Sequence, residues 1–209
     1  MKRIQAVFLA LILFLFCVVN VHAGGTYNLG ELSYWYSDSN KIGRWNYPCI
    51  NMCYTKISTN PSFPFETAMN HGKTQWNSAL TNFTIISNSL SECKISFYGG
   101  TYAQLVDVVY GFYNEPSSTV GYSNVYYQDE GTWTYGSSSK RGVELVFAEA
   151  GIVDNGSTTN EYKGTCTHEI GHCLGWFGHA GSSSDIMYAY VNNETSLSIY
   201  DKRHLVQVY

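Results

Sequence analysis

Apolar and polar residues recur along the chain with two periods, and these periods predict the order of its helices and strands. Between residues 65 and 80 the apolar positions have helical spacing, with Pro64 near the start, so this segment is predicted to be a long helix. Shorter segments rich in β-branched and aromatic residues are predicted to be strands. These segments are residues 44–58, 83–86, 94–98, 108–112 and 143–147.

A second helix is predicted to start near Thr158, because Thr158 and Glu161 fit the spacing of a capping box. Gly175 tolerates a positive φ and is therefore expected to end this helix with a sharp turn. The Tyr-, Gly- and Ser-rich segment 99–139 is expected to hold long surface loops besides the strand predicted at residues 108–112. Apolar spacing along the second helix continues through Tyr162, Cys166, Ile170 and Cys173.

The candidate metal-binding and catalytic residues lie at the end of this second helix. His168 and His172 are four residues apart, so a helix places both imidazoles on one face, and Glu169 lies beside them. A turn at Gly175 can bring His179 back as a third nitrogen ligand. Three histidines that leave a fourth position for water are typical of a catalytic zinc site, in which the glutamate activates that water.

The whole run from His168 to His179 resembles the metzincin metallopeptidases, whose motif is H-E-x-x-H-x-x-G-x-x-H followed by a methionine turn. Met187 stands eight residues after His179 and is followed by a tyrosine, as in the matrix metalloproteinase (matrixin) branch. Residues 197–209 resemble the C-terminal helix of that branch. The resemblance implies that Asp201 in this helix forms hydrogen bonds to the methionine turn.

The resemblance implies an α+β fold of the metzincin type. Such a fold has a twisted mixed β-sheet packed on two long helices, a catalytic cleft, and a small C-terminal subdomain with the methionine turn and a terminal helix. It also implies a zinc-dependent endopeptidase that acts on a protein or peptide substrate. His168, His172 and His179 are then the metal ligands and Glu169 the general base and acid. The chain shows no cysteine-switch motif and lacks the histidine-rich structural zinc site of vertebrate matrixins.

The N-terminal segment has the pattern of a signal for secretion of the protein. Lys2 and Arg3 precede an apolar run that ends before Val21-His22-Ala23, the pattern of a secretory signal peptide at residues 1–23. The apolar run is shorter than the roughly 18–20 residues of a membrane-spanning helix. Residues 24–43 are expected to be a short propeptide or an N-terminal arm, and residues 44–209 the catalytic domain. The predicted location is extracellular, with no membrane association after signal cleavage.

The net charge limits the binding partners that we expect, and the cysteines limit the possible disulfides. Because Lys2 and Arg3 fall in the signal, 10 of the 12 basic residues remain against 16 acidic ones, a formal charge of −6. This balance argues against nucleic acid as a partner, and we expect a monomer. An oxidising compartment permits disulfides, with Cys93 paired to Cys49 or Cys53. Cys166 and Cys173 would be too far apart along one helix to form a bridge.

Several alternatives accompany this interpretation. Calcium is a second candidate ion, since oxygen-rich acidic loops suit it. Tyr188 and Tyr190 are expected to pack in the core or in the wall of the substrate pocket. One other function is a secreted zinc-fold binding or inhibitory protein without peptidase activity, and another is a zinc amidase acting on cell-wall peptides. The acidic candidates for calcium are Asp129, Glu130, Asp154 and Glu161.

Overall fold

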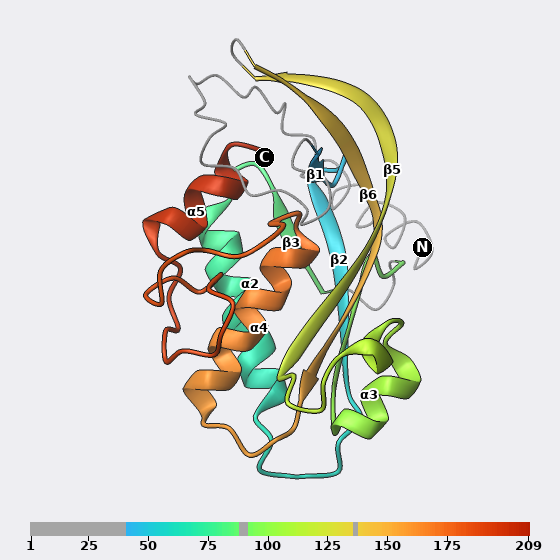
Figure 1. Cartoon of the computed structure of the whole chain (residues 1–209), viewed down its shortest axis with the longest axis vertical. Coiled ribbons are helices and arrows are strands. Elements are labelled where there is room, and N and C mark those ends of the chain that lie inside the picture. The colour runs from blue at the N-terminus through green and yellow to red at the C-terminus, as the bar shows by residue number, and fades with distance from the viewer. Residues whose placement is uncertain (1–40, 88–91, 136–137) are drawn as a thin grey trace, which may run out of the picture.

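The computed structural model describes residues 41–87, 92–135 and 138–209. The predicted signal peptide and most of the predicted arm therefore lie outside the described residues. A mixed sheet forms the centre of the fold, and Figure 1 shows it curving beside a pair of long helices. None of the described helices combines the length and the apolar character that crossing a membrane requires.

The sheet has the order β1-β6-β4-β2-β3, and β5 pairs with β6. Pairing is parallel along β1, β6, β4, β2 and β3 and antiparallel between β5 and β6. The long strand β6 receives both β1 and β4 because they pair with successive parts of it. The bounds are β1 Lys41–Arg44, β2 Cys49–Lys56, β3 Thr84–Ile86, β4 Ile95–Gly100, β5 Gly121–Tyr135 and β6 Ser138–Val153.

Two long helices, α2 (Phe65–Ala79) and α4 (Thr159–Cys173), cover one face of the sheet. They approach closely because each contributes a glycine to the contact. A Cβ on Gly72 would lie 3.1 Å from the Thr167 backbone, and one on Gly171 would lie 2.8 Å from the Trp76 ring. The Trp76 indole also donates a hydrogen bond of 2.8 Å to the Thr167 carbonyl. These contacts fix the position of α4, which carries the predicted site.

The buried side chains confirm most of the predicted pattern. The helix predicted at residues 65–80 is α2, and the apolar positions predicted along α4 are all buried. Four of the five predicted strands are present, and the first of them is β2. β1 was not predicted, since it shares only Arg44 with the predicted strand and its other residues lie in the segment predicted to be an arm. The main core lies between the sheet and the two helices, with the large side chains Trp45, Trp76, Phe65, Phe83 and Phe97 fully buried.

Two predictions for the middle of the chain were wrong. The strand predicted at residues 108–112 is instead the end of helix α3 (Tyr102–Val108), a turn, and the short 3-10 helix η2 (Phe112–Asn114). A capping box at Thr101 starts α3, and Leu105, Val109 and Phe112 pack together on the outer face of the sheet. Their spacing is helical, and this outweighs the β-branched character of the segment.

The loops predicted at residues 99–139 were the second error. This segment holds α3, η2 and the 15-residue strand β5. Tyrosine and threonine favour strands when a partner strand lies beside them, and β6 supplies that partner along the full length of β5. The edge strand that results borders the candidate site.

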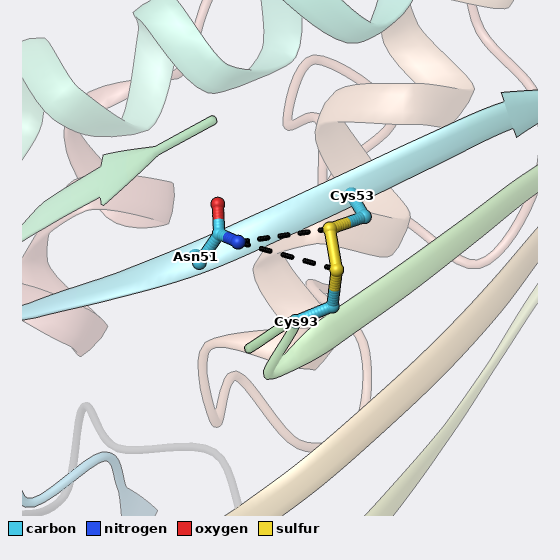
Figure 2. Close-up of a disulfide and its surroundings, with 3 residues drawn as sticks. All are labelled: Asn51, Cys53 and Cys93. Atoms are coloured by element: carbon cyan, nitrogen blue, oxygen red, sulfur yellow. Dashed lines mark hydrogen bonds between the residues drawn. A yellow bond between two sulfur atoms is a disulfide. The ribbon is translucent and has the colours of Figure 1, made fainter. Parts of the chain in front are cut away.

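A disulfide joins Cys53 in β2 to Cys93, just before β4 (Figure 2). It selects one of the two predicted pairings for Cys93. Asn51 points its amide at the bridge, with Nδ2 3.7 Å from the Cys53 sulfur and 4.0 Å from the Cys93 sulfur. Cys166 and Cys173 remain buried thiols on α4, as their spacing predicted.

Candidate metal centre and active site

Helix α4 begins where the sequence predicts. The Thr158 hydroxyl accepts a hydrogen bond from the Glu161 amide, and the Glu161 carboxylate accepts one of 2.6 Å from the Thr158 amide. The two bonds satisfy amides that the first turn of a helix leaves without partners. With its start fixed, α4 presents His168 and His172 on one face, one turn apart.

The chain reverses sharply after α4 at two glycines. Gly175 has a φ of +99° and Gly178 a φ of +82°. A Cβ on Gly175 would also lie 2.3 Å from the Gly43 carbonyl oxygen in β1, so only glycine fits there. The reversal returns His179 to α4, where its ring centroid lies 5.2 Å from those of His168 and His172. The predicted turn at Gly175 is confirmed.

The three histidines form a group suited to a metal ion. One ligand atom from each residue lies within 4.8 Å of the others, and no other such group of His, Cys, Asp or Glu occurs in the described part of the chain. His168 Nδ1 lies 2.7 Å from the Ile186 carbonyl oxygen, and His172 Nδ1 2.6 Å from the Trp176 carbonyl oxygen. Because a carbonyl only accepts, both Nδ1 atoms carry the proton, and both Nε2 lone pairs are left for a metal.

Burial sets the protonation of these rings. It lowers the pKa of His168 to about 4, although the hydrogen bond to the Ile186 carbonyl acts in the opposite direction. Burial also lowers the pKa of His172 well below its usual value, and that of the more exposed His179 to a lesser degree. The imidazoles are therefore neutral near pH 7, which is the form that binds a metal.

Glu169 lies on the same helix with only 5% of its surface exposed. Its Oε2 accepts a hydrogen bond of 2.5 Å from the Ser123 hydroxyl in β5. Burial raises the pKa of Glu169 to about 8, while the Ser123 hydrogen bond acts to lower it. A carboxylate with a pKa in this range can accept and return a proton near neutral pH.

A cavity of about 530 Å³ contains the three histidines and Glu169. Its walls come from the start of β5, from α4, and from residues 188–192. Tyr188 and Tyr190 lie in this last wall, as predicted, although Tyr190 is 73% exposed and takes no part in the core. Among the described residues that line the cavity, Glu115 and Glu169 are acidic and none is Lys or Arg.

The C-terminal helix α5 (Ile199–Val206) binds the segment that lies beneath the histidines. Asp201 is fully buried, and its two carboxylate oxygens accept hydrogen bonds of 2.9 and 3.1 Å from the amides of Ile186 and Met187. The hydrogen bonds expected for Asp201 are therefore confirmed. Since the Ile186 carbonyl accepts from His168, this carboxylate is connected to the metal centre through one residue.

The four acidic candidates for calcium do not come together. Asp129 and Glu130 lie in β5, whereas Asp154 follows β6 and Glu161 lies in α4. Each already has neighbours that bind its carboxylate. The structure therefore gives calcium no support. Their partners are Arg141 for Asp129, Asn46 for Glu130, Ser58 and Asn60 for Asp154, and Thr158 for Glu161.

A mixed sheet packed on two helices, with a histidine–glutamate helix facing a cavity, defines the class of zinc metallopeptidases. The family model for peptidase M10, described as Matrixin, matches residues 53–209, and the chain belongs to the matrixin family. Membership confirms the resemblance seen in the sequence and implies the metzincin fold, dependence on zinc, and hydrolysis of peptide bonds. Among curated proteins, none matches the chain significantly.

Three residues that shape the cavity were not predicted from the sequence. Ser123 and Gly121 in β5 contact Glu169, and Glu115 precedes β5 at the cavity wall. All three fall in the segment that composition assigned to loops. These residues could have been found only by predicting that β5 is a strand opposite α4. That prediction depends on the pairing of β5 with β6, which joins distant parts of the chain.

Proposed function

We propose that this chain is a secreted zinc-dependent endopeptidase whose general base is Glu169. The observation that carries the proposal is the presence of three neutral imidazoles and one buried carboxylate in a single cavity. A site that only stabilises a fold needs no such carboxylate, and its ligands close the metal off from solvent. Here the ligand group opens into about 530 Å³ of space.

His168, His172 and His179 would hold the zinc ion. The donor set fits this metal, since three histidines leave one position for water or substrate. When bound, Zn²⁺ supplies Lewis acidity, which lowers the pKa of a water molecule and polarises a carbonyl group. The carbonyls of Ile186 and Trp176 orient two of the rings, and Met187, fully buried next to Gly171, forms the floor beneath them.

Glu169 transfers the proton. Its carboxylate accepts a proton from the attacking water, and the water oxygen forms the new bond to the carbonyl carbon of the substrate. The carboxylic acid then gives that proton to the nitrogen of the leaving amine as the carbon–nitrogen bond breaks. The low exposure of Glu169 favours this cycle, because burial raises its pKa above the ordinary value of 4.5 and so makes the carboxylate a stronger base.

An extended peptide is the substrate that the cavity wall suits. β5 pairs with β6 on one side only within the described sheet, and its first residues line the cavity. The free side of such a strand can pair with a peptide backbone. No Lys or Arg in the described lining is placed to bind a C-terminal carboxylate, so cleavage within a chain is favoured over removal of its last residue.

The proposed location rests on other features. The basic and apolar pattern of residues 1–23 is that of a secretory signal, and the disulfide between Cys53 and Cys93 suits an oxidising compartment. The excess of acidic residues argues against nucleic acid as a partner. We infer a monomeric enzyme that works outside the cell on proteins or peptides.

The first prediction concerns Glu169→Ala. Zinc content should stay stoichiometric, because the three imidazoles are untouched, while peptide cleavage falls by about 10²- to 10⁴-fold or more. Cleavage of a peptide library by the purified protein, with and without a zinc chelator, measures the loss, and mass spectrometry of the products locates the cut.

His179→Ala is the matched comparison, since it should lose both zinc and activity. Cleavage that persists in Glu169→Ala at the wild-type rate would contradict the mechanism. Stoichiometric zinc without cleavage of any peptide would instead favour a binding or inhibitory protein. Hydrolysis of cell-wall peptides alone would favour an amidase.

A further inference from the structure

Ser123 forms a close contact with the proposed general base. Its Oγ lies 2.5 Å from Glu169 Oε2 and 3.1 Å from the backbone carbonyl oxygen of the same residue. Within the described chain, no other side chain donates a hydrogen bond to this carboxylate. A hydrogen bond to a carboxylate is stronger than one between neutral groups, so this contact strongly restricts the Glu169 side chain.

The surroundings of Ser123 direct its hydroxyl proton. A serine hydroxyl has one proton to donate and can accept through its lone pairs. The Cys173 sulfur lies 3.8 Å from Ser123 Oγ, with the thiol as donor. Because Cys173 donates to the Ser123 oxygen, it does not use the hydroxyl proton of Ser123. That proton can therefore be donated to Glu169.

β5 holds the carboxylate from a second position. A Cβ on Gly121 would lie 2.7 Å from Glu169 Oε1 and 3.0 Å from its Cγ, so the absence of a side chain there makes room for the carboxylate. Gly121 and Ser123 are two residues apart on one strand and therefore face the same side. Both positions are paired with β6, Gly121 with Ile152 and Ser123 with Ala150, which makes β5 a firm support.

We propose that Ser123 is a positioning residue that holds the Glu169 carboxylate in the orientation needed for proton transfer. This inference rests on the proposed function, in which Glu169 is the general base. A general base acts only within hydrogen-bond reach of its proton, and a displacement of about 1 Å can cost about 100-fold in rate. The hydroxyl holds Oε2, and Oε1 is left for the proton.

The test compares Ser123→Ala with Ser117→Ala. Ser117 is exposed and does not line the cavity, so its variant controls for the removal of a serine hydroxyl outside the site. We expect Ser123→Ala to lower kcat between about 10- and 100-fold with KM within about twofold of wild type. Zinc content should stay at the wild-type value, and the urea midpoint should fall modestly because the buried Glu169 carboxylate loses its hydrogen-bond donor. Ser117→Ala should match wild type throughout.

Ser123→Thr keeps the hydroxyl and should recover most of kcat. A Ser123→Ala variant with normal zinc and wild-type kcat would overturn the inference and leave the proposed function standing. A rise in KM alone would also overturn it, since Ser123 would then contact substrate instead of orienting the base. A wild-type protein that binds zinc but cleaves no peptide would overturn the proposed function and this inference with it.

Discussion

Glu115 is the second carboxylate of the cleft, and it has no counterion there. The described residues that line the cavity include no Lys or Arg, and none of the hydrogen bonds or ion pairs in the described chain reaches its carboxylate. Burial, and after it the negative charge of Glu115, raises the pKa of the neighbouring Tyr122. At the residue scale, this wall therefore presents a negative charge to the substrate.

Glu115 should favour a substrate with a positive charge beside the cut. Peptides that differ only by Lys or Gln at each position next to the scissile bond provide the measurement. At one of these positions we expect wild type to cleave the Lys peptide about two- to fivefold faster in kcat/KM, the range of a partly exposed ion pair. Glu115→Gln should remove that difference, because the attraction disappears with the charge.

Asp107→Asn is the matched control, since Asp107 is exposed on the nearby helix α3 but does not line the cavity. It changes the net charge of the protein by the same amount. Equal preferences in wild type and Glu115→Gln would show that Glu115 does not contact the substrate. Loss of the preference in Asp107→Asn would point to the charge of the whole molecule instead.

At the scale of elements, the two long helices begin differently. α4 starts with a capping box, in which the Glu161 carboxylate accepts from the Thr158 amide. α2 starts after Pro64, and its first-turn residue Glu66 forms no cap hydrogen bond. The start of α4 is thus specified by local hydrogen bonds, whereas α2 depends more on its packing against α4 and the sheet.

The capping box should make stability depend on pH through Glu161. Its hydrogen bond with the Thr158 backbone lowers the pKa of Glu161 below the ordinary value of 4.5. A carboxylate with a lowered pKa in the folded state stabilises the protein above that ordinary value, and this contribution is lost as pH falls through the folded pKa. Urea unfolding from neutral to acidic pH should therefore show a smaller acid loss in Glu161→Gln than in wild type.

Glu66→Gln is the control for this comparison, because it makes the same change in the first turn of a long helix without a capping box. Its acid loss should equal that of wild type. Glu161→Ala should in addition lower the free energy of unfolding at pH 7 by about 1 kcal/mol, the usual contribution of a cap hydrogen bond. An identical acid profile in wild type and Glu161→Gln would contradict the assignment.

At the scale of the whole molecule, Asp201 connects the C-terminal helix to the metal centre. Its buried carboxylate accepts from the amides of Ile186 and Met187 and also from that of Ser198, which starts α5. The Trp176 indole, just beyond α4, donates to the Asp201 carbonyl at 3.2 Å. Helix α5 therefore positions the segment that lies beneath the histidines.

Asp201→Ala should both destabilise the fold and loosen the metal. Two buried amides and one partly buried amide would lose their acceptor, and each unsatisfied group costs about 1–3 kcal/mol, so the free energy of unfolding should fall by about 3 kcal/mol or more. Zinc affinity, measured by competition with a chelator, should fall as well, because Ile186 orients His168.

Lys202→Ala provides the control, since Lys202 is the exposed neighbour of Asp201 on the same helix. It should leave both quantities near their wild-type values. Asp201→Asn keeps one carbonyl acceptor and should fall between wild type and Asp201→Ala in stability. Wild-type zinc affinity in a folded Asp201→Ala protein would show that the C-terminal helix does not support the site.

The cluster of three histidines was predictable because its determinants are local. His168 and His172 are one helical turn apart, Gly175 permits the reversal, and His179 follows within a few residues. The start of α4 at Thr158 is also encoded in four neighbouring residues. In each case the chemistry depends on backbone geometry over a short span, which residue type and spacing specify directly.

Contacts between distant segments were decided by the tertiary structure alone. Residues 121–135, part of the segment predicted to hold loops, form β5 because β6 pairs with them. That pairing brings Ser123 within 2.5 Å of Glu169, 46 residues away. The partner of Cys93 was likewise decided by the tertiary structure, which places Cys53, 40 residues away in the chain, against it. The sequence by itself predicted the groups that we propose to hold the metal and move the proton, because these groups lie within one helix and its turn. The tertiary structure decided what surrounds them, because strand pairing depends on residues far apart in the chain.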